Sequence, residues 1–351
     1  MLSHNFSAIG LMSGTSLDGL DICYTKFEQY NEHLCYEIIK AQTIRYTNEW
    51  ENRLKNAIHL SSEELLQLNV EYGFLLGQLV KDFIDNNTIE NIDVIASHGH
   101  TVFHQPSKKF TLQIGDGRAI KLLTNIPVVY DFRTADVLMG GNGAPLVPIG
   151  DEMLFGSFSA CINLGGFSNI SFKNNGNRVA FDIAPVNIVL NFFAQKLGME
   201  YDKDGLFAQN GKVDVSVLNK LNNLPYYHSK FPKSLGVEWV NENVLPLLEG
   251  MEYIDALATF TEHAAVQIAS VIDQQQLEII LVTGGGTFNT YLIEKIQQKI
   301  KGKLFLPSQE IIEYKEALIF ALMGVLRINN LDNVLSSATG SSKNHCAGLL
   351  V

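Results

Sequence analysis

The sequence predicts a mixed α/β protein made of two similar halves. Three strand-like segments come first, and helices and strands alternate after them. A second series with the same order begins near residue 159. In each half a glycine-rich loop follows the first apolar strand, and a third such loop lies at 284–286. A strand meander followed by alternating helices and strands differs from a doubly wound dinucleotide fold.

The first half opens with a predicted β-meander. Ser7–Met12 and Leu20–Phe27 have strand-like patterns, and His33–Tyr46 adds a third strand. Hydroxyls and early acids at the start of 61–86 predict a helix that begins there. Ile92–Ser97 is a compact apolar run that predicts a buried strand.

The second half repeats this order without clear residue identity. Ser159–Leu164, Ile170–Lys173 and Arg178–Ile183 are predicted strands, and Val186–Leu197 is a predicted helix. The repeat is therefore one of architecture. We expect domains at 1–140 and 141–351, with a boundary that lies somewhere within 133–158.

Composition excludes several classes of protein. The chain has 351 residues, of which 46% are hydrophobic and 18% charged, which is typical of a soluble globular protein. A formal net charge of −11 argues against a nucleic-acid-binding surface. Four cysteines without C-x-x-C spacing predict reduced thiols and a cytoplasmic protein. We expect neither a signal peptide nor a membrane span, because no apolar run has the required length.

The loop between the first two strands is the leading candidate for an anion-binding site. Its glycines permit a tight turn, and its hydroxyls and exposed N–H groups can donate to phosphate oxygens. Asp18 and Asp21 would repel a phosphate, so either could hold Mg²⁺ or orient a substrate hydroxyl, and Asp18 is the candidate metal ligand. An ordinary hairpin turn is the alternative. The candidate nucleotide-binding residues here are Gly14, Thr15, Ser16, Leu17, Asp18, Gly19, Leu20 and Asp21.

Two further loops strengthen the hypothesis of a nucleotide site. Gly165 and Gly166 follow the first strand of the second half, and Gly284, Gly285 and Gly286 follow a later strand. A helix that starts after Gly286 would direct its N-terminal N–H groups at an anion. The spacing matches neither G-x-G-x-x-G nor a P-loop. We therefore expect a nucleotide held between the two halves.

The sequence resembles the anhydro-N-acetylmuramic acid kinases, a family of the actin, sugar-kinase and heat-shock superfamily of two-lobed ATPases. The similarity covers roughly residues 8 to 340, in the order of the family's motifs. These motifs are GLMSGTSLDGLD (10–21), SHGHTVFHQP (97–106), LQIGDGRAI (112–120), DFRTADVLMGGNGAPLVP (131–148), NLGGFSNI (163–170), FDIAPVN (181–187), DKDGLFAQNGKV (202–213), PKSLG (232–236), VTGGGTFN (282–289) and EALIFA (316–321).

The resemblance implies a fold and a reaction. The fold is two α/β lobes of duplicated actin-like, ribonuclease H-like topology, with ATP and Mg²⁺ in the cleft between the lobes. The reaction is ATP-dependent conversion of 1,6-anhydro-N-acetylmuramic acid to N-acetylmuramic acid 6-phosphate, with hydrolytic opening of the anhydro ring. This step belongs to peptidoglycan recycling in the cytoplasm. The partners are thus an amino sugar and ATP, and a homodimer is an open possibility.

The resemblance also assigns roles to single residues. Asp182 matches the catalytic aspartate, which would act as the base that activates water. Arg133 could form a bidentate pair with the lactyl carboxylate of the sugar. His98 and Glu316 are further candidates for the sugar site. The alternatives are a helix N-cap for Asp182 and a helix-surface acid for Glu316.

Three histidines, His98, His100 and His104, have a spacing that could also suggest a metal site. On a strand and its following loop their side chains need not converge. We expect them to order the loop or contact the sugar, with no transition metal.

The chain departs from the family's usual motifs in the C-terminal segment CAGLLV and at two further places. Where the family has T-G-P-G-N, this chain has Ile183, Ala184 and Val186 around a retained Pro and Asn. Where the family has T-G-R-E, this chain has Leu235 and Val237, so an arginine is missing. These changes keep two alternatives open: a kinase for another amino or anhydro sugar, and an actin-like nucleotide switch without sugar chemistry.

Overall fold

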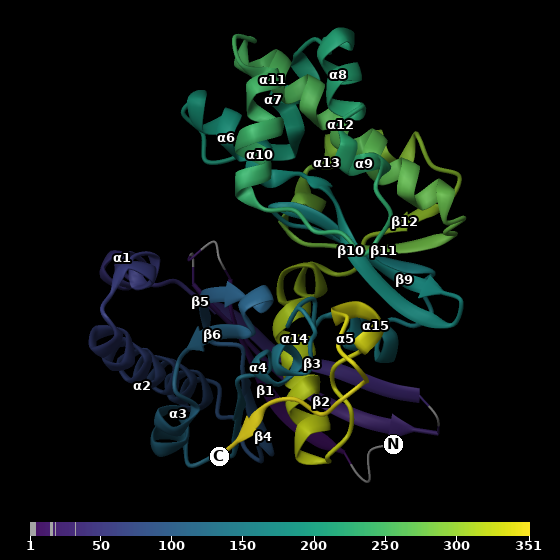
Figure 1. The fold of residues 1–351 in the computed structure, drawn as a ribbon. Coiled ribbons are helices and arrows are strands. Elements are labelled where there is room, and N and C mark those ends of the chain that lie inside the picture. Colours follow the sequence, from purple (N-terminus) through teal and green to yellow (C-terminus); the bar gives the residue numbers. More distant parts are fainter. Residues whose placement is uncertain (1–4, 15–16, 18, 32) are drawn as a thin grey trace. The chain divides into compact units, whose positions relative to one another are not determined.

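The chain folds into two compact units in the computed structural model, which describes residues 5–14, 17, 19–31 and 33–351. The first unit comprises residues 1–154 and 314–351, and the second comprises residues 155–313 (Figure 1). The first division, after Leu154, lies within the range 133–158 given for the boundary, and the last 38 residues, 314–351, group with the first unit, which the sequence did not indicate.

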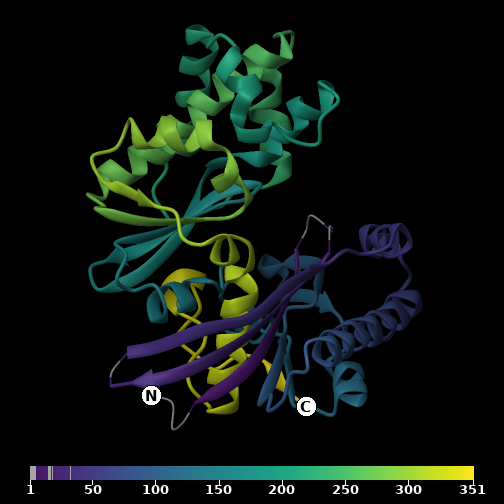
Figure 2. The same ribbon diagram turned by 180° about the vertical axis from the view of Figure 1, so that it is seen from behind.

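The first unit is built on a six-stranded sheet with the order β13-β7-β4-β1-β2-β3. The first three strands form the expected antiparallel meander, and β4 and β7 continue the sheet parallel to β1. Figure 2 shows the long ribbon of this meander. The strands are β1 (Phe6–Ser13), β2 (Leu20–Tyr30), β3 (His33–Ile44), β4 (Val94–Ser97), β7 (Val128–Tyr130) and β13 (Leu349–Leu350).

Helices cover both faces of this sheet. Successive residues of β1 point to opposite faces, so neighbouring residues of this strand contact different helices. Ile9 and Leu11 are buried in the same apolar cluster as Leu68 and Leu76 of α2 (Ser62–Asn86). Gly10, between them, faces α14 (Gln309–Ile328), where it lies against the backbone of Ala317. This close approach holds the helix that carries Glu316 on the sheet.

Local sequence explains where α2 begins. The hydroxyl of Ser61 accepts the N–H of Glu64, and the carboxylate of Glu64 accepts the N–H of Ser61, which is a capping box. The other elements of this unit are α1 (Asn48–Lys55), η1 (Ala57–His59), β5 (His100–Gln105), η2 (Pro106–Lys108), β6 (Phe110–Ile114), α3 (Gly117–Thr124), α4 (Thr134–Leu138), α5 (Pro148–Met153) and α15 (Ser336–Thr339). Strands β5 and β6 form a separate hairpin.

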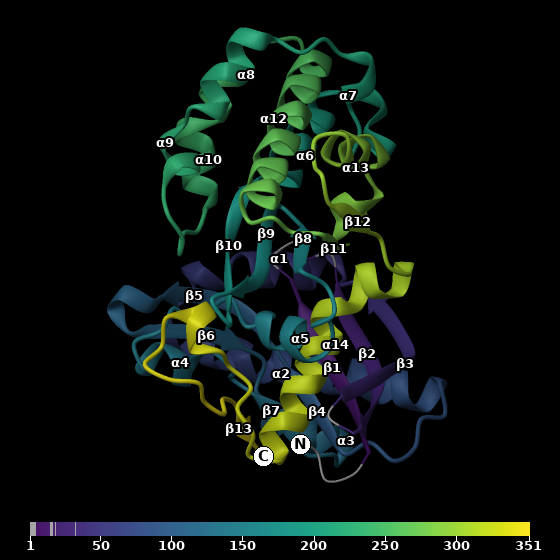
Figure 3. The same ribbon diagram turned by 90° about the vertical axis from the view of Figure 1, so that its right-hand side faces the viewer.

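The second unit is built on a five-stranded sheet with the order β10-β9-β8-β11-β12. Its strands are β8 (Ala160–Leu164), β9 (Phe167–Asn174), β10 (Asn177–Pro185), β11 (Ile279–Thr283) and β12 (Lys303–Phe305). Its helices are α6 (Asn187–Lys196), η3 (Lys203–Gly205), α7 (Leu206–Asn210), α8 (Val215–Asn222), α9 (Pro225–His228), α10 (Val237–Asn243), α11 (Leu245–Leu248), α12 (Tyr253–Gln274), η4 (Gly285–Phe288) and α13 (Thr290–Gln297). The long α12 packs against α6, α7, α8 and α13 (Figure 3).

The two sheets share one topology. In each, a meander of three antiparallel strands is extended from its first strand by two parallel strands: β4 and β7 in the first unit, and β11 and β12 in the second. The duplicated actin-like topology expected from the sequence is confirmed. Among the helices of the described residues, none is long and apolar enough to cross a membrane.

The contact between β1 and α14 predicts a stability effect. Gly10→Ala would drive a methyl group into the carbonyl oxygen of Ala317, and overpacking of this kind costs about 1–3 kcal/mol. Thermal or urea unfolding should show this loss. Gly236→Ala is the control, because its added carbon meets only the flexible end of Glu238. Equal stability of both variants would contradict the packing of α14 on β1.

Candidate functional site

In the first unit, Arg133 and His98 form a hydrogen-bonded pair. The Nε and Nη2 groups of Arg133 donate to Nε2 of His98 over 3.0 and 2.8 Å, and Nη1 donates to the carbonyl of Gly143 over 2.6 Å. A guanidinium has five N–H bonds. One N–H on each terminal nitrogen is therefore left without a partner among the described residues. Two such parallel donors suit the two oxygens of a carboxylate.

His98 is neutral, and its surroundings fix which nitrogen carries the proton. The Nδ1 atom lies 2.9 Å from the carbonyl of Gly99, an acceptor, so Nδ1 is the donor and Nε2 accepts from Arg133. Burial lowers the pKa of His98 well below its usual range, and the charge of Arg133 lowers this pKa further. The imidazole therefore positions the guanidinium without adding a second positive charge.

Glu316 belongs to the same electrostatic group. Burial raises the pKa of Glu316 above its usual value, and the nearby charge of Arg133 acts in the opposite direction. Burial lowers the pKa of Arg133 to about 10, while Glu316 and Asp136 act to raise it. The structure thus brings His98, Arg133 and Glu316 together in one unit.

The other two histidines of the motif point to different partners. His100 is buried with its ring edge-on to Tyr72, and His104 contacts the hydroxyl of Thr111 at 3.1 Å. No cluster of three or more His, Cys, Asp or Glu side chains suited to a metal ion occurs among the described residues.

The loop between β1 and β2 is tied to the first unit at both ends. The hydroxyl of Tyr46 donates to Ser13 over 3.0 Å, and the hydroxyl of Thr43 donates to Asp21 over 2.6 Å. Of the loop's predicted nucleotide contacts, Thr15, Ser16 and Asp18 lie outside the described residues. The other five, Gly14, Leu17, Gly19, Leu20 and Asp21, are described.

In the second unit, the turn between β8 and β9 consists of Gly165 and Gly166 alone, since Phe167 already belongs to β9. The carbonyl of Gly165 accepts the N–H of Asn187 over 3.2 Å, and that of Gly166 accepts the N–H of Val186 over 2.8 Å. The first N–H groups of α6 are therefore used within the protein.

The loop 284–286 lies beside this turn. Gly284 has φ +84°, and a side chain there would overlap the amide oxygen of Asn163. The side chain of Asn187 donates to the carbonyl of Leu164 over 3.2 Å and also lies next to Gly286. Two of the three predicted glycine loops thus meet, with Asn163 and Asn187 between them. Both asparagines lie in the family motifs, and neither was assigned a role from the sequence.

This loop leads into η4, and not directly into a helix as predicted. Asn289 caps α13 by accepting the N–H of Leu292 over 3.0 Å, so the start of α13 is satisfied internally. The free donors lie earlier, since the N–H groups of Gly285 and Gly286 open η4 and have no partner within it. The buried hydroxyl of Thr287 has no hydrogen-bond partner among the described residues.

Asp182 lies within β10, opposite Asn169, at a register shift between Asp182 and Ala184. The helix-cap alternative is wrong, because the residue that precedes α6 is Val186 and Asp182 makes no capping bond. The Oδ2 atom accepts the N–H of Leu235 over 2.9 Å, and the carbonyl accepts the hydroxyl of Tyr226 over 2.6 Å. A β-bulge changes the direction in which a side chain leaves a strand. The bulge beside Asp182 explains why a residue within β10 can reach Leu235.

The environment of Asp182 makes its carboxylate more basic. Burial raises the pKa of Asp182, and the hydrogen bond from Leu235 lowers it by less. The other oxygen, Oδ1, has no partner among the described residues. Lys233 lies 4.5 Å from the centre of the Tyr226 ring and donates to the carbonyl of Tyr226. The carboxylate of Asp182 can accept a proton at Oδ1.

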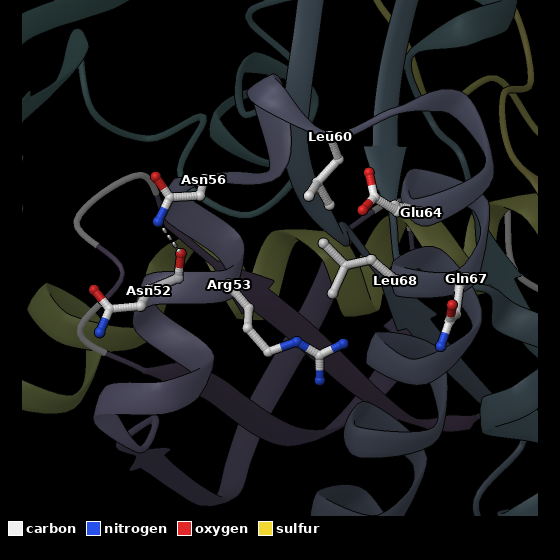
Figure 4. A pocket seen from close by; sticks show the side chains of 7 residues that line it. All are labelled: Asn52, Arg53, Asn56, Leu60, Glu64, Gln67 and Leu68. Atoms are coloured by element: carbon white, nitrogen blue, oxygen red, sulfur yellow. Dashed lines mark hydrogen bonds between the residues drawn. The ribbon is translucent and has the colours of Figure 1, made fainter.

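A groove of about 400 Å³ lies elsewhere in the first unit, between α1 and α2 (Figure 4). None of the predicted site residues lines it. Its lining consists of Asn52, Arg53, Asn56, Leu60, Glu64, Gln67 and Leu68.

Comparison with known proteins identifies the family. The profile described as anhydro-N-acetylmuramic acid kinase matches residues 6–351. The chain belongs to the anhydro-N-acetylmuramic acid kinase family. It is accordingly a sugar kinase, and neither alternative function is favoured.

Curated members of the anhydro-N-acetylmuramic acid kinase family match along almost their whole length. The Vibrio cholerae protein is 33% identical over 97% of both chains, and the Legionella pneumophila protein is 33% identical over 95% of this chain and 94% of its own. Among solved structures, component A of (R)-2-hydroxyglutaryl-CoA dehydratase from Acidaminococcus fermentans matches 92% of this chain and 99% of its own, with 11% identity and a TM-score of 0.49.

The departures from the family motifs have simple structural positions. Ile183, Ala184 and Val186 are buried in the core of the second unit. Leu235 bonds to Asp182 through its backbone N–H, so a changed side chain leaves that bond in place. Val237 is exposed at the start of α10.

The raised pKa of Asp182 predicts a pH-dependent stability effect. An unfolded aspartate has a pKa of about 3.9, so the folded protein binds the proton more tightly, and stability falls as pH rises from about 4 through the raised folded pKa. Asp182→Asn removes this cost. Urea unfolding at pH 7 should show the variant at least as stable as the parent, with the difference shrinking toward pH 4. A variant clearly less stable at pH 7 would contradict the burial cost.

Proposed function

We propose that this chain opens 1,6-anhydro-N-acetylmuramic acid with Asp182 as the general base and phosphorylates the freed O6. The observation that carries this proposal is the partly buried carboxylate of Asp182, held by one oxygen and open at the other. Family membership supplies the reaction, and the residue roles are our assignment. The product is N-acetylmuramic acid 6-phosphate, as needed for peptidoglycan recycling.

Asp182 has the chemistry that ring opening requires. Oδ1 accepts a proton from water while the water oxygen bonds to C1 of the sugar. The C1–O6 bond breaks as the bond from water forms, and O6 leaves with its electron pair. The N–H of Leu235 stays on Oδ2 and keeps the carboxylate in one orientation. A raised pKa brings the base closer to the working pH, which favours proton transfer.

Arg133 is the proposed contact for the lactyl carboxylate of the sugar. Its two remaining N–H groups match a carboxylate in a bidentate geometry, and neutral His98 fixes the plane of the guanidinium. Glu316, whose pKa is raised by burial, is assigned to a polar group of the sugar.

The glycine loops are the proposed nucleotide contacts. ATP with Mg²⁺, when bound, supplies the phosphoryl group that O6 accepts. In the second unit Gly285 borders open space, and the unpaired hydroxyl of Thr287 and the N–H groups of η4 are suitable donors to an anion. In the first unit Asp21 offers a carboxylate of the kind Mg²⁺ takes alongside nucleotide phosphates, and Asp18 stays a prediction outside the described residues.

A cytoplasmic location and a homodimer remain predictions. All four cysteines, Cys23, Cys35, Cys161 and Cys346, are free thiols, which suits a reducing compartment where ATP is available.

The role of Asp182 predicts the effect of one substitution on turnover. Asp182→Asn keeps the shape and removes the base, so the rate of sugar phosphorylation should fall by at least about 100-fold. Affinity for ATP should barely change, because this carboxylate is not a nucleotide contact. A coupled ADP-release assay and calorimetry measure the two quantities. Asp255→Asn is the control, since Asp255 also accepts a backbone N–H, from Lys212. Near-normal turnover by Asp182→Asn would refute the assignment.

The open space at Gly285 predicts a selective loss of nucleotide binding. The Cβ of Gly285→Ala would have only the amide nitrogen of Asn187, 4.0 Å away, within reach, so the free protein should fold normally. If the nucleotide fills that space, its affinity should fall by about 10-fold, which is about 1.4 kcal/mol. Calorimetric titration with ADP measures the affinity. Unchanged affinity beside the Gly236→Ala control would remove this loop from the nucleotide site.

A further inference from the structure

Asp136 carries a carboxylate that is fully buried in the first unit, on α4 and three residues after Arg133. Its Oδ2 atom accepts the N–H of Gly143 over 2.7 Å, and its Oδ1 atom accepts the hydroxyl of Thr339 over 2.7 Å. Nε2 of His345 lies 3.7 Å from Oδ1. A buried carboxylate persists only when such donors compensate for lost water. The structure therefore uses two distant segments to hold one side chain.

The loop after α4 wraps around this carboxylate. The N–H of Gly141 donates to the backbone carbonyl of Asp136 over 2.9 Å, and a side chain at Gly141 would overlap Oδ2. Gly143 is then held on both sides, because its N–H bonds to Asp136 and its carbonyl accepts Nη1 of Arg133. Gly143 therefore connects the carboxylate of Asp136 to the guanidinium of Arg133, so a displacement of Asp136 would also displace Arg133.

The C-terminal segment forms backbone hydrogen bonds with the same loop after α4. The carbonyl of Thr339 accepts the N–H of Asn142 over 2.8 Å, and the carbonyl of Met139 accepts the N–H of Ser342 over 3.3 Å. A backbone bridge between Val334 and His345 closes this segment on itself. The polar sequence of this segment is typical of an exposed tail, yet Thr339 is buried.

We propose that Thr339 is a positioning residue for sugar binding, acting through Asp136 and Gly143 on the carboxylate-binding guanidinium of Arg133. This inference rests on the proposed role of Arg133. Thr339 fixes Oδ1 of Asp136, and Oδ2 is then presented to Gly143. The carbonyl of Gly143 in turn orients Nη1, which leaves the free N–H pair directed at the sugar's carboxylate.

A double-mutant cycle tests this chain of contacts. Thr339→Val keeps the shape and removes the hydroxyl, which donates to Asp136 and also contacts Ser341, so KM for the anhydro sugar should rise about 10-fold with kcat little changed. Thr339→Ser keeps a hydroxyl and should restore KM. In an Arg133→Lys background, which lacks the planar fork, Thr339→Val should change kcat/KM less than 2-fold. Thr124→Val is the matched control, because its hydroxyl donates to the carbonyl of Ile120 and accepts the N–H of Ile126, both at the end of α3.

Each outcome decides the matter. Coupling between the two sites, with rescue by serine and an unchanged KM for ATP, supports the proposal. An equal loss in both backgrounds, or no loss beside a wild-type-like Thr124→Val, overturns it. If Arg133→Lys alone leaves KM for the sugar unchanged, the proposed role of Arg133 fails instead. Thermal unfolding of every variant separates these results from a loss of folding.

Discussion

The partly buried carboxylate of Asp182 is the feature on which the proposed chemistry of the second unit depends. Burial of Asp182 raises its pKa, so its charged form costs free energy at neutral pH. The protein offsets only part of this cost, with one backbone donor from Leu235. A fully satisfied carboxylate would be more stable and less basic. The bulge in β10 and the segment around Tyr226 and Lys233 keep Asp182 in this partly satisfied environment.

The first unit handles a buried cation in a comparable way. Arg133 keeps three of its N–H groups on protein acceptors and leaves two for a ligand. His98 contributes a lone pair and no charge, and Asp136 contributes a charge without direct contact. A bidentate ion pair with a carboxylate of the protein itself would have used the two remaining N–H groups of Arg133. Fixing the guanidinium through neutral acceptors leaves two of its N–H groups available for the proposed anionic substrate.

Local patterns explain what the sequence could predict. The alternation in β1 and β2, the capping box of α2 and the glycines after β8 and β11 each depend on neighbouring residues. The contacts that were missed join distant segments. Thr339 meets Asp136 across 203 positions, and Leu235 meets Asp182 across 53. The N-cap alternative for Asp182 did not foresee the bulge that lies beside this residue within β10. One local contact was also missed: Asn289, the last residue of the motif VTGGGTFN, caps α13, a role that was not assigned to it from the sequence.

The central claim is that Asp182 is a general base whose pKa is raised by its surroundings. The most direct measurement combines the acid limb of the kcat/KM pH profile with the pKa of Asp182 from carboxyl carbon-13 NMR in the free protein. The account predicts that the two values coincide and lie above about 4, the usual value for an aspartate. An acid limb that differs clearly from the measured pKa, or a pKa at or below about 4, would contradict it.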